Sequence, residues 1–225
     1  MTSSMDALAH LRVIAIDGPA GAGKSTVAKA LARRLGLTYL DTGAMYRAVT
    51  VAALRRAVDP AHAEAVAALA TSVSMEIGER VLLDGDDVTT DIRTPEVAQA
   101  VSAVAANPAV RDELRDQQRA WALARGGGVI EGRDIGTVVF PDARLKLYLT
   151  ASPEVRAARR HQEQGADAQQ LAEVAAAIAA RDHLDRSRSH APLAEAADAV
   201  VVDTSDRSVE AIVDEIVRLL DVREG

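Results

Sequence analysis

Cysteine is absent from the 225 residues, which excludes disulfide bonds and cysteine-ligated zinc sites. Aromatic side chains make up only 2% of the chain, so a hydrophobic core must be built from alanine, valine, leucine and isoleucine. No apolar run approaches the roughly 18 residues of a membrane span, and residues 1–10 lack the basic start and apolar core of a secretory signal. These absences favour a cytoplasmic protein with no membrane partner.

Positive charge is also scarce. The 26 lysines and arginines stand against 33 acidic residues, which gives a formal net charge of −7 and argues against nucleic acid as the main partner. Lysine occurs only at Lys24, Lys29 and Lys146, so most cations are arginines, the better residue for a bidentate grip on phosphates. The single asparagine, Asn107, is followed by proline, so the Asn-Lys-x-Asp run of a guanine-reading switch is missing.

The most informative stretch is residues 18–26, GPAGAGKST, which match the phosphate-binding P-loop pattern. An apolar run at residues 13–16 precedes it and an amphipathic segment at residues 27–35 follows it, as in a strand, loop and helix. Its glycines let backbone N–H groups point at a phosphate, and the helix adds its positive N-terminal end. We expect Lys24 near the β- and γ-phosphates of ATP and the Ser25 hydroxyl at Mg²⁺. The predicted ATP site comprises Gly18, Pro19, Ala20, Gly21, Ala22, Gly23, Lys24, Ser25 and Thr26.

The rest of the chain alternates short apolar strands with amphipathic helices. Alternation of this kind predicts an α/β fold with a P-loop, in which helices flank a doubly wound parallel sheet of five core strands. Residues 73–92 differ, because their hairpin signals predict a small inserted antiparallel sheet. Gly126 to Gly128 are expected to end a helix, and residues 165–170 to form a mobile connection. Further core strands are expected at residues 37–41, 129–130, 144–149 and 200–202, the last of them buried. Helices are expected at residues 42–56, 62–70, 94–106, 107–123 and 168–185, and also after Ser152-Pro153 and after Ser208.

Two polar clusters follow predicted strand ends, where the ligands of parallel α/β sheets bind. The first, DTGAMYR at residues 41–47, could hold a second phosphate through Thr42, Tyr46 and Arg47, or could be a capped helix with a solvated arginine. The second, EGRDIGT at residues 131–137, sets an arginine between two acids. There an acid can orient magnesium-bound water and the arginine can grip a phosphate, while a turn stabilised by the acids and the arginine is the alternative.

Arginines also recur along two predicted helices. Arg181, Asp185 and Arg188 fall on one helix face, with Asp182 and Arg186 on the adjoining stripe. Arg156, Arg159 and Arg160 also share a face. Taken by themselves, both faces also fit a solvated, ion-paired helix surface.

In order along nearly the whole chain, these motifs resemble the bacterial-type cytidylate kinases. The matching segments are residues 16–19 (IDGP), 41–47, 91–93 (DIR), 131–142 (EGRDIGTVVFPD), 181–188 and 191–193 (APL). The resemblance implies a nucleoside monophosphate kinase that transfers the γ-phosphoryl group of ATP to CMP or dCMP, in pyrimidine metabolism. It implies a core at 11–41, 126–151 and 191–225, a monophosphate-binding part with the insert at 42–125, and a lid at 152–190.

The resemblance also implies roles for individual residues. Lys24, Arg133, Arg181 and Arg188 would be catalytic, and Arg156 and Arg160 would contact ATP. Thr42, Tyr46, Arg47, Arg133 and Arg188 would surround the acceptor phosphate, Arg181 and Asp185 the ribose, and Ser102, Arg111 and Asp134 the cytosine. Ser25 would bind magnesium directly. Asp41 and Glu131 would contact the ion through water. Thr42 replaces the serine common in the family, and Glu131 an aspartate of some members.

Two alternatives are weighed against this prediction. A P-loop kinase of another small acceptor, either another nucleoside monophosphate or a small hydroxy acid, fits the P-loop equally well. A non-catalytic nucleotide-binding regulator is the alternative from another functional class. The prediction itself is a monomer whose partners are ATP, magnesium and CMP or dCMP.

Overall fold

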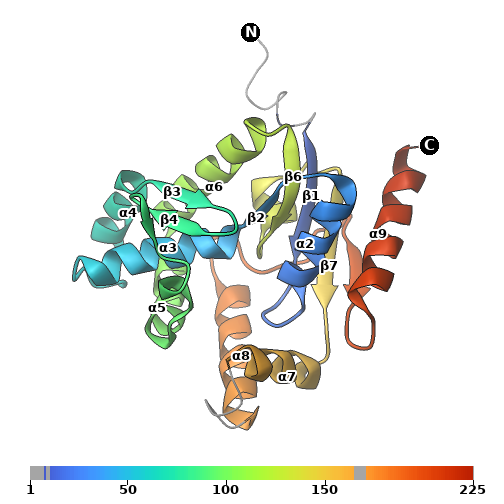
Figure 1. The fold of residues 1–225 in the computed structure, drawn as a ribbon. Helices are drawn as coiled ribbons and strands as arrows, with labels where there is room; N and C mark the ends of the chain where they lie inside the picture. The colour runs from blue at the N-terminus through green and yellow to red at the C-terminus, as the bar shows by residue number, and fades with distance from the viewer. Residues whose placement is uncertain (1–7, 9–10, 165–170, 225) are drawn as a thin grey trace. The chain divides into compact units, whose positions relative to one another are not determined.

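The computed structural model describes residues 8, 11–164 and 171–224. Contacts within the chain group it into two compact units: Met1–Tyr39 with Arg125–Gly225, here unit 1, and Leu40–Ala124, here unit 2. Figure 1 labels the helices and strands of both units. The mobile connection expected at residues 165–170 lies outside the described residues.

A five-stranded sheet in the order β2-β6-β1-β7-β8 underlies the P-loop. Strand β1 pairs in parallel with β6 and with β7, and β7 pairs in parallel with β8. The order places β1 at the centre, so its carboxyl end is flanked by the ends of β6 and β7. The doubly wound parallel sheet predicted from the sequence is confirmed. The bounds of the five strands are β1 Arg12–Asp17, β2 Tyr39–Asp41, β6 Gly127–Glu131, β7 Leu145–Thr150 and β8 Val200–Asp203.

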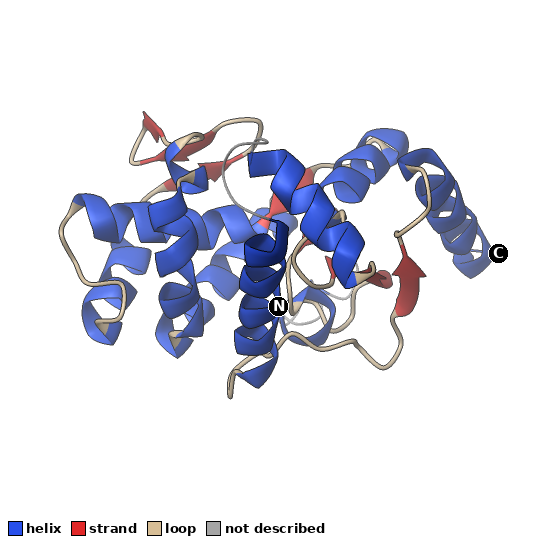
Figure 2. Cartoon of the chain, turned by 90° about the horizontal axis from the view of Figure 1, so that it is seen from below, coloured by secondary structure: helices blue, strands red, loops and turns tan. Residues whose placement is uncertain are grey.

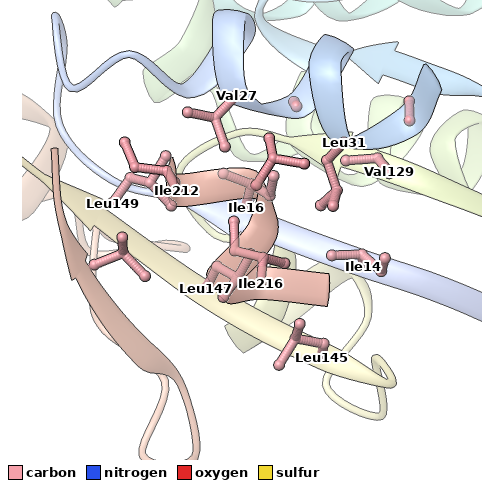
Figure 3. Close-up of a cluster of buried hydrophobic side chains, with 14 of the residues drawn as sticks. Ile14, Ile16, Val27, Leu31, Val129, Leu145, Leu147, Leu149, Ile212 and Ile216 are labelled. Carbon is pink, nitrogen blue, oxygen red and sulfur yellow. The ribbon is translucent and has the colours of Figure 1, made fainter. Parts of the chain in front are cut away.

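Aliphatic side chains make up the buried core on one face of this sheet, in keeping with the scarcity of aromatics, and the partly buried Tyr39 packs against it. Ile14 and Ile16 of β1 lie beside Leu147 of β7, and two helices cover them. Figure 3 shows Leu31 of α2 and Ile216 of α9 packed over these strands. This burial fixes the strand-to-helix turn that forms the P-loop. The helices of unit 1 are α2 Lys24–Leu35, α7 Pro153–Gln164, α8 Leu171–Ser187 and α9 Val209–Glu224. Helix α7 packs against α8 (Figure 1).

Unit 2 is mainly helical, and its small sheet is the expected insert (Figure 2). Helix α3 packs against α5, and α4 packs against α6. The three-stranded sheet has the order β3-β4-β5 with antiparallel pairing, which confirms the predicted hairpins. The bounds are α3 Thr42–Arg55, α4 Ala63–Ser72, β3 Met75–Ile77, β4 Val81–Leu83, β5 Asp86–Asp87, a 3₁₀ turn Asp91–Arg93, α5 Pro95–Ala106 and α6 Pro108–Leu123.

Local capping signals were reliable guides to where helices begin. The Thr94 hydroxyl accepts from the Val97 N–H at 3.4 Å, and the Asn107 side chain accepts from the Ala109 N–H at 3.1 Å. In each helix proline occupies the first turn, where no backbone N–H donor is required. The Ser208 cap of α9 is also confirmed, since its hydroxyl accepts from the Ala211 N–H at 3.2 Å.

Two sequence-based expectations were wrong, and one local structure was not anticipated. The run Gly126 to Gly128 does not merely end a helix: α6 stops at Leu123, and β6 already begins at Gly127. A Cβ on Gly127 would lie 2.5 Å from the Arg12 carbonyl carbon, so glycine is needed where β6 passes β1. Strand β8 is not buried throughout, because it is the sheet edge and Val201 is 48% exposed. Residues 135–139 form a π-helical turn that no sequence pattern indicated.

The helix expected at residues 168–185 is described from Leu171 to Ser187, and its first three predicted residues lie outside the described part. Among the described residues, no helix combines the length and apolar character needed to cross a bilayer.

Candidate functional site

The P-loop of residues 18–26 connects the end of β1 to the first turn of α2, as the motif requires. Helix α2 begins at Lys24, so the positive end of its dipole lies at the loop. Lys24 is buried, and its Nζ donates to the Pro19 carbonyl oxygen at 2.7 Å. The lysine is therefore folded back over its own loop.

The charge state of Lys24 is strongly affected by its surroundings. Burial, and then the positive charge of Arg133, lower the pKa of Lys24 from 10.5 to about 7. Glu131 and Asp17 act in the opposite direction, and Arg181 adds to the lowering. Three cationic side chains of unit 1 thus influence one another at the P-loop. A polyanion placed there would relieve this repulsion.

Asp17, the last residue of β1, supports the turn that follows β6. It is buried, and its two carboxylate oxygens accept from the Ile135 N–H at 2.9 Å and the Gly136 N–H at 2.7 Å. Burial raises the pKa of Asp17 from 3.8 to about 6, although the two amide hydrogen bonds oppose this shift. Because the supported turn follows directly on Arg133 and Asp134, Asp17 fixes the backbone from which these side chains project.

Glu131 ends β6, in register with Ile16 on the neighbouring strand. It is buried and accepts a hydrogen bond from the Tyr39 hydroxyl. The carboxylate therefore lies at the carboxyl edge of the sheet, where the sequence predicted an acid that contacts magnesium through water.

Helix α8 brings Asp185 to the arginines of the predicted catalytic set. Arg133 Nε donates to Asp185 Oδ2 at 2.8 Å, and Arg188 is ion-paired with the other oxygen. Burial alone would raise the pKa of Asp185, but the charges of Arg133 and Arg188 lower it below its ordinary value. The carboxylate thus stays ionised and holds two guanidinium groups together.

Helix α7 places its two predicted ATP contacts differently. Arg156 Nη1 donates to the Ala20 carbonyl oxygen of the P-loop at 3.1 Å and is ion-paired with Asp182 of α8. Arg160 instead pairs with Glu163 at 3.2 Å on the helix surface. Arg159, for which the sequence favoured no role, donates to the Thr204 hydroxyl at 2.9 Å.

In unit 2, the DTGAMYR segment forms the junction of β2 and α3. Asp41 caps α3 by accepting from the Ala44 N–H at 2.9 Å, and its second oxygen accepts from Arg47 Nη2 at 2.8 Å. Thr42 is buried in the first helical turn. A Cβ on Gly43 would lie 3.1 Å from both Arg47 Nη1 and Asp41 Oδ1, so the pair leaves little space for a side chain there.

Two predicted acceptor residues of unit 2 come together although 65 positions separate them in the sequence. The Arg111 guanidinium carbon lies 5.5 Å from the centroid of the Tyr46 ring, within cation–π range. Arg111 is buried, and its Nη1 donates to the Ala105 carbonyl oxygen at 3.1 Å. Ser102 lies half-buried on α5. The arginine is thus held at both the ring and the backbone.

Sequence reasoning assigned no role to Asp17, Asp182 and Thr204, which are among the buried polar residues of unit 1. Asp17 and Thr204 each carry a sequence signal, because each is a polar residue at or just beyond the end of an apolar strand. Asp182 has no such signal, since on a helical projection it falls beside the arginine stripe, where a solvated acid is the ordinary expectation.

The chain matches the protein-family model described as Cytidylate kinase over residues 14–222. It is 51% identical to a cytidylate kinase of Mycobacterium leprae (strain Br4923) over 216 residues, which cover 95% of this chain and 97% of that protein. It is 53% identical to a cytidylate kinase of Mycolicibacterium paratuberculosis, covering 91% and 92% respectively. Among solved structures, an uncharacterized protein from Eubacterium ventriosum aligns with a TM-score of 0.50 at 12% identity, covering 93% of this chain and 98% of that one. That last likeness concerns the fold alone.

Proposed function

The chain belongs to the cytidylate kinase family, and we propose on this premise that it transfers the γ-phosphoryl group of ATP to CMP or dCMP. The products are ADP and CDP or dCDP, within pyrimidine nucleotide metabolism. The observation that carries the proposal is the P-loop with its buried Lys24, together with Arg133 and Arg188, which Asp185 holds by ion pairs. Cations brought together in this way repel one another, and a bound polyanion would relieve that repulsion.

The donor ATP would be bound by the P-loop, with Lys24 turned from the Pro19 carbonyl to the β- and γ-phosphates. Arg156 and Arg160 of the lid helices would add contacts to ATP. In this family of reactions, catalysis rests on positioning and charge neutralisation, so we expect neither a covalent enzyme intermediate nor an obligatory general base.

Magnesium is expected to accompany ATP. The Ser25 hydroxyl is exposed at the start of α2, which leaves it accessible to an ion that also binds phosphate oxygens. Asp41 and Glu131 would contact the ion through water. When bound, magnesium would neutralise charge on the phosphates. The protein's own contribution would be the positioning of the side chains described above.

The acceptor phosphate would contact Thr42, Tyr46, Arg47, Arg133 and Arg188. Arg133 and Arg188 are already held by Asp185, so little reorganisation is needed when charge develops during transfer. Arg181 and Asp185 would contact the ribose.

The cytosine base would be read by Ser102, Arg111 and Asp134. Cytosine presents an amino donor at position 4 where uracil presents a carbonyl acceptor, and an ionised Asp134 can accept from the former alone. Arg111 can donate to the cytosine N3 and O2 edge. A polar site left unpaired by the wrong base discriminates strongly, by up to about 10⁴-fold in favourable cases.

Residues 152–190 are proposed to act as a lid that closes over both nucleotides and keeps water from the γ-phosphoryl group. We also propose that the protein acts in the cytoplasm, in keeping with the absence of cysteine, and as a monomer, because one chain carries every residue assigned above.

A coupled assay of ADP release tests the proposal, with ATP, magnesium and CMP, dCMP, UMP, AMP or shikimate as acceptor. We expect ADP with CMP and dCMP at a catalytic efficiency well above that for UMP. The Lys24→Ala variant serves as the control, since a contaminating kinase would still release ADP in its presence. ADP release with AMP or shikimate but not with CMP would contradict the proposal.

A further inference from the structure

Asp182 connects helix α8 to the P-loop, 162 positions away in the sequence. Its side chain is only 3% exposed, and Oδ1 accepts from the Ala20 N–H at 3.1 Å. Oδ2 is ion-paired with Arg156 Nη1, which also donates to the Ala20 carbonyl oxygen at 3.1 Å. The N–H and the C=O of one P-loop residue are therefore both held, one by α8 and the other by α7.

The backbone of α7 also lies directly against the loop at the next residue. A Cβ on Gly21 would lie 2.8 Å from the Arg156 carbonyl oxygen and 2.9 Å from its Cβ. Gly21 has a φ of +75°, so both its conformation and its surroundings favour glycine. This close approach keeps Arg156 within reach of Ala20 and Asp182.

The same helix that contacts the P-loop also orients the catalytic arginines. Asp185 lies one helical turn after Asp182 and holds Arg133 and Arg188 through its two oxygens. Because α8 is a continuous helix over this turn, a displacement of Asp182 must also move Asp185. Two buried carboxylates on one helix thus join the P-loop to the arginine pair.

A buried ion pair is an expensive way to pack a helix against a loop, since apolar residues of similar volume often do so as well or better. The retained charge at Asp182 points to a role in fixing one relative position of the two elements.

We propose that Asp182 is a positioning residue that couples the P-loop to α8, so that ATP binding orders the helix that holds Arg133 and Arg188. The inference rests on the proposed function, because it requires ATP at the P-loop. Asp182 touches neither reacting group and acts through Ala20 on one side and Asp185 on the other.

Hydrogen exchange of the full chain, with and without the magnesium complex of the β,γ-imido analogue of ATP and with no acceptor, tests the coupling. In the native sequence we expect the analogue to slow exchange in both α2 and α8, by at least about fivefold in α8. In the Asp182→Asn variant, protection of α2 should persist and protection of α8 should be lost. The KM for CMP should rise at least about fivefold in this variant, for the same reason.

Thr204→Val is the matched control. The Thr204 hydroxyl is also buried against the P-loop, where it donates to the Ala22 carbonyl oxygen at 3.1 Å, but it arises from the segment after β8. This variant removes the contact with the loop and the contact with Arg159 of α7, but no printed contact of α8, so α8 should keep its response to the analogue. If Asp182→Asn does not fold, the double variant Arg156→Met with Asp182→Asn removes both buried charges and is measured in saturating analogue.

Equal protection of α8 from hydrogen exchange in the native and Asp182→Asn proteins would overturn the coupling. It would also be overturned if the analogue slowed exchange in α2 but not in α8 of the native protein. Loss of the α8 response in Thr204→Val as well would assign the effect to general loosening of the loop and also overturn it. A native protein in which not even α2 is protected would refute the ATP site itself, and the coupling with it.

Discussion

Binding of MgATP should be accompanied by proton uptake at Lys24. In the ligand-free protein, burial and the charge of Arg133 lower the pKa of Lys24 to about 7, so the lysine is largely neutral in mildly basic solution. A triphosphate placed beside it supplies negative charge and should return the pKa toward its ordinary value of 10.5. The bound lysine must then take a proton from the buffer.

The pKa of about 7 sets the size of the effect. At pH 8 the free protein has ~0.9 of its Lys24 neutral, and at pH 7 about half, so binding should take up ~0.9 and ~0.5 proton respectively. The affinity for ATP should weaken correspondingly as pH rises: the Kd should increase roughly eightfold per pH unit near pH 8. The pKa of Asp17, which also influences Lys24, lies near 6, so this carboxylate is largely ionised at pH 8.

Isothermal titration calorimetry of MgATP without acceptor measures this uptake. Titrations at one pH in buffers of different ionisation enthalpy give the proton number as the slope of the observed enthalpy. Lys24→Arg should bind with almost no uptake, because a guanidinium keeps its proton at every accessible pH. Lys29→Met is the matched control, since Lys29 lies exposed on the same helix and its ammonium lies over the Tyr39 ring at 5.5 Å.

An uptake near zero at pH 8 in the native protein would refute the reasoning, because Lys24 would then be protonated before ATP arrives. Equal uptake in the native and Lys24→Arg proteins would show that another group takes the proton. Uptake that grows from pH 8 to pH 6 would also contradict it, since the lysine is already charged in acid.

Four further outcomes follow from the site. Lys24→Ala should lower the transfer rate by roughly a hundredfold or more, the effect of losing ~3 kcal/mol of transition-state stabilisation, with an unchanged circular dichroism spectrum. Arg47→Ala and Arg133→Ala should lower kcat/KM for CMP while ATP affinity in direct titration changes little; an equal loss of ATP affinity would place them in the donor site. Asp134→Asn should narrow the preference for CMP over UMP, and an unchanged ratio of kcat/KM values would leave its carboxylate with a structural role. Folding raises the pKa of Asp17 from 3.8 to about 6, so between these pH values the folded state binds a proton that the unfolded state does not. The contribution of Asp17 to the free energy of unfolding should therefore fall as pH rises from about 4 to about 6, by on the order of 3 kcal/mol. Urea unfolding of the native protein and Asp17→Asn across this range should differ in slope, and parallel curves would contradict the assignment.

The sequence by itself determined the features that depend on neighbouring residues. The P-loop was predictable because glycine spacing, the apolar run before it and the helix after it are all local. The caps at Thr94, Asn107 and Ser208 were predictable for the same reason, since a cap and its acceptor or donor lie within three residues. Alternation of strands and helices was enough to predict the parallel sheet, and the family resemblance supplied the acceptor. The roles assigned to individual site residues, among them Thr42, Ser102 and Arg160, all stay predictions.

Only the tertiary structure decided which charges meet. The contacts of Asp182 with Ala20, of Asp185 with Arg133 and of Asp17 with Gly136 span 162, 52 and 119 positions, so no local pattern contains them. The lowered pKa of Lys24 likewise depends on burial by elements distant in sequence. The exposed side of β8 was mispredicted because an apolar run looks the same at the edge and at the centre of a sheet. Sequence spacing specifies which residues share a face, whereas packing alone specifies what that face meets and how much water reaches it.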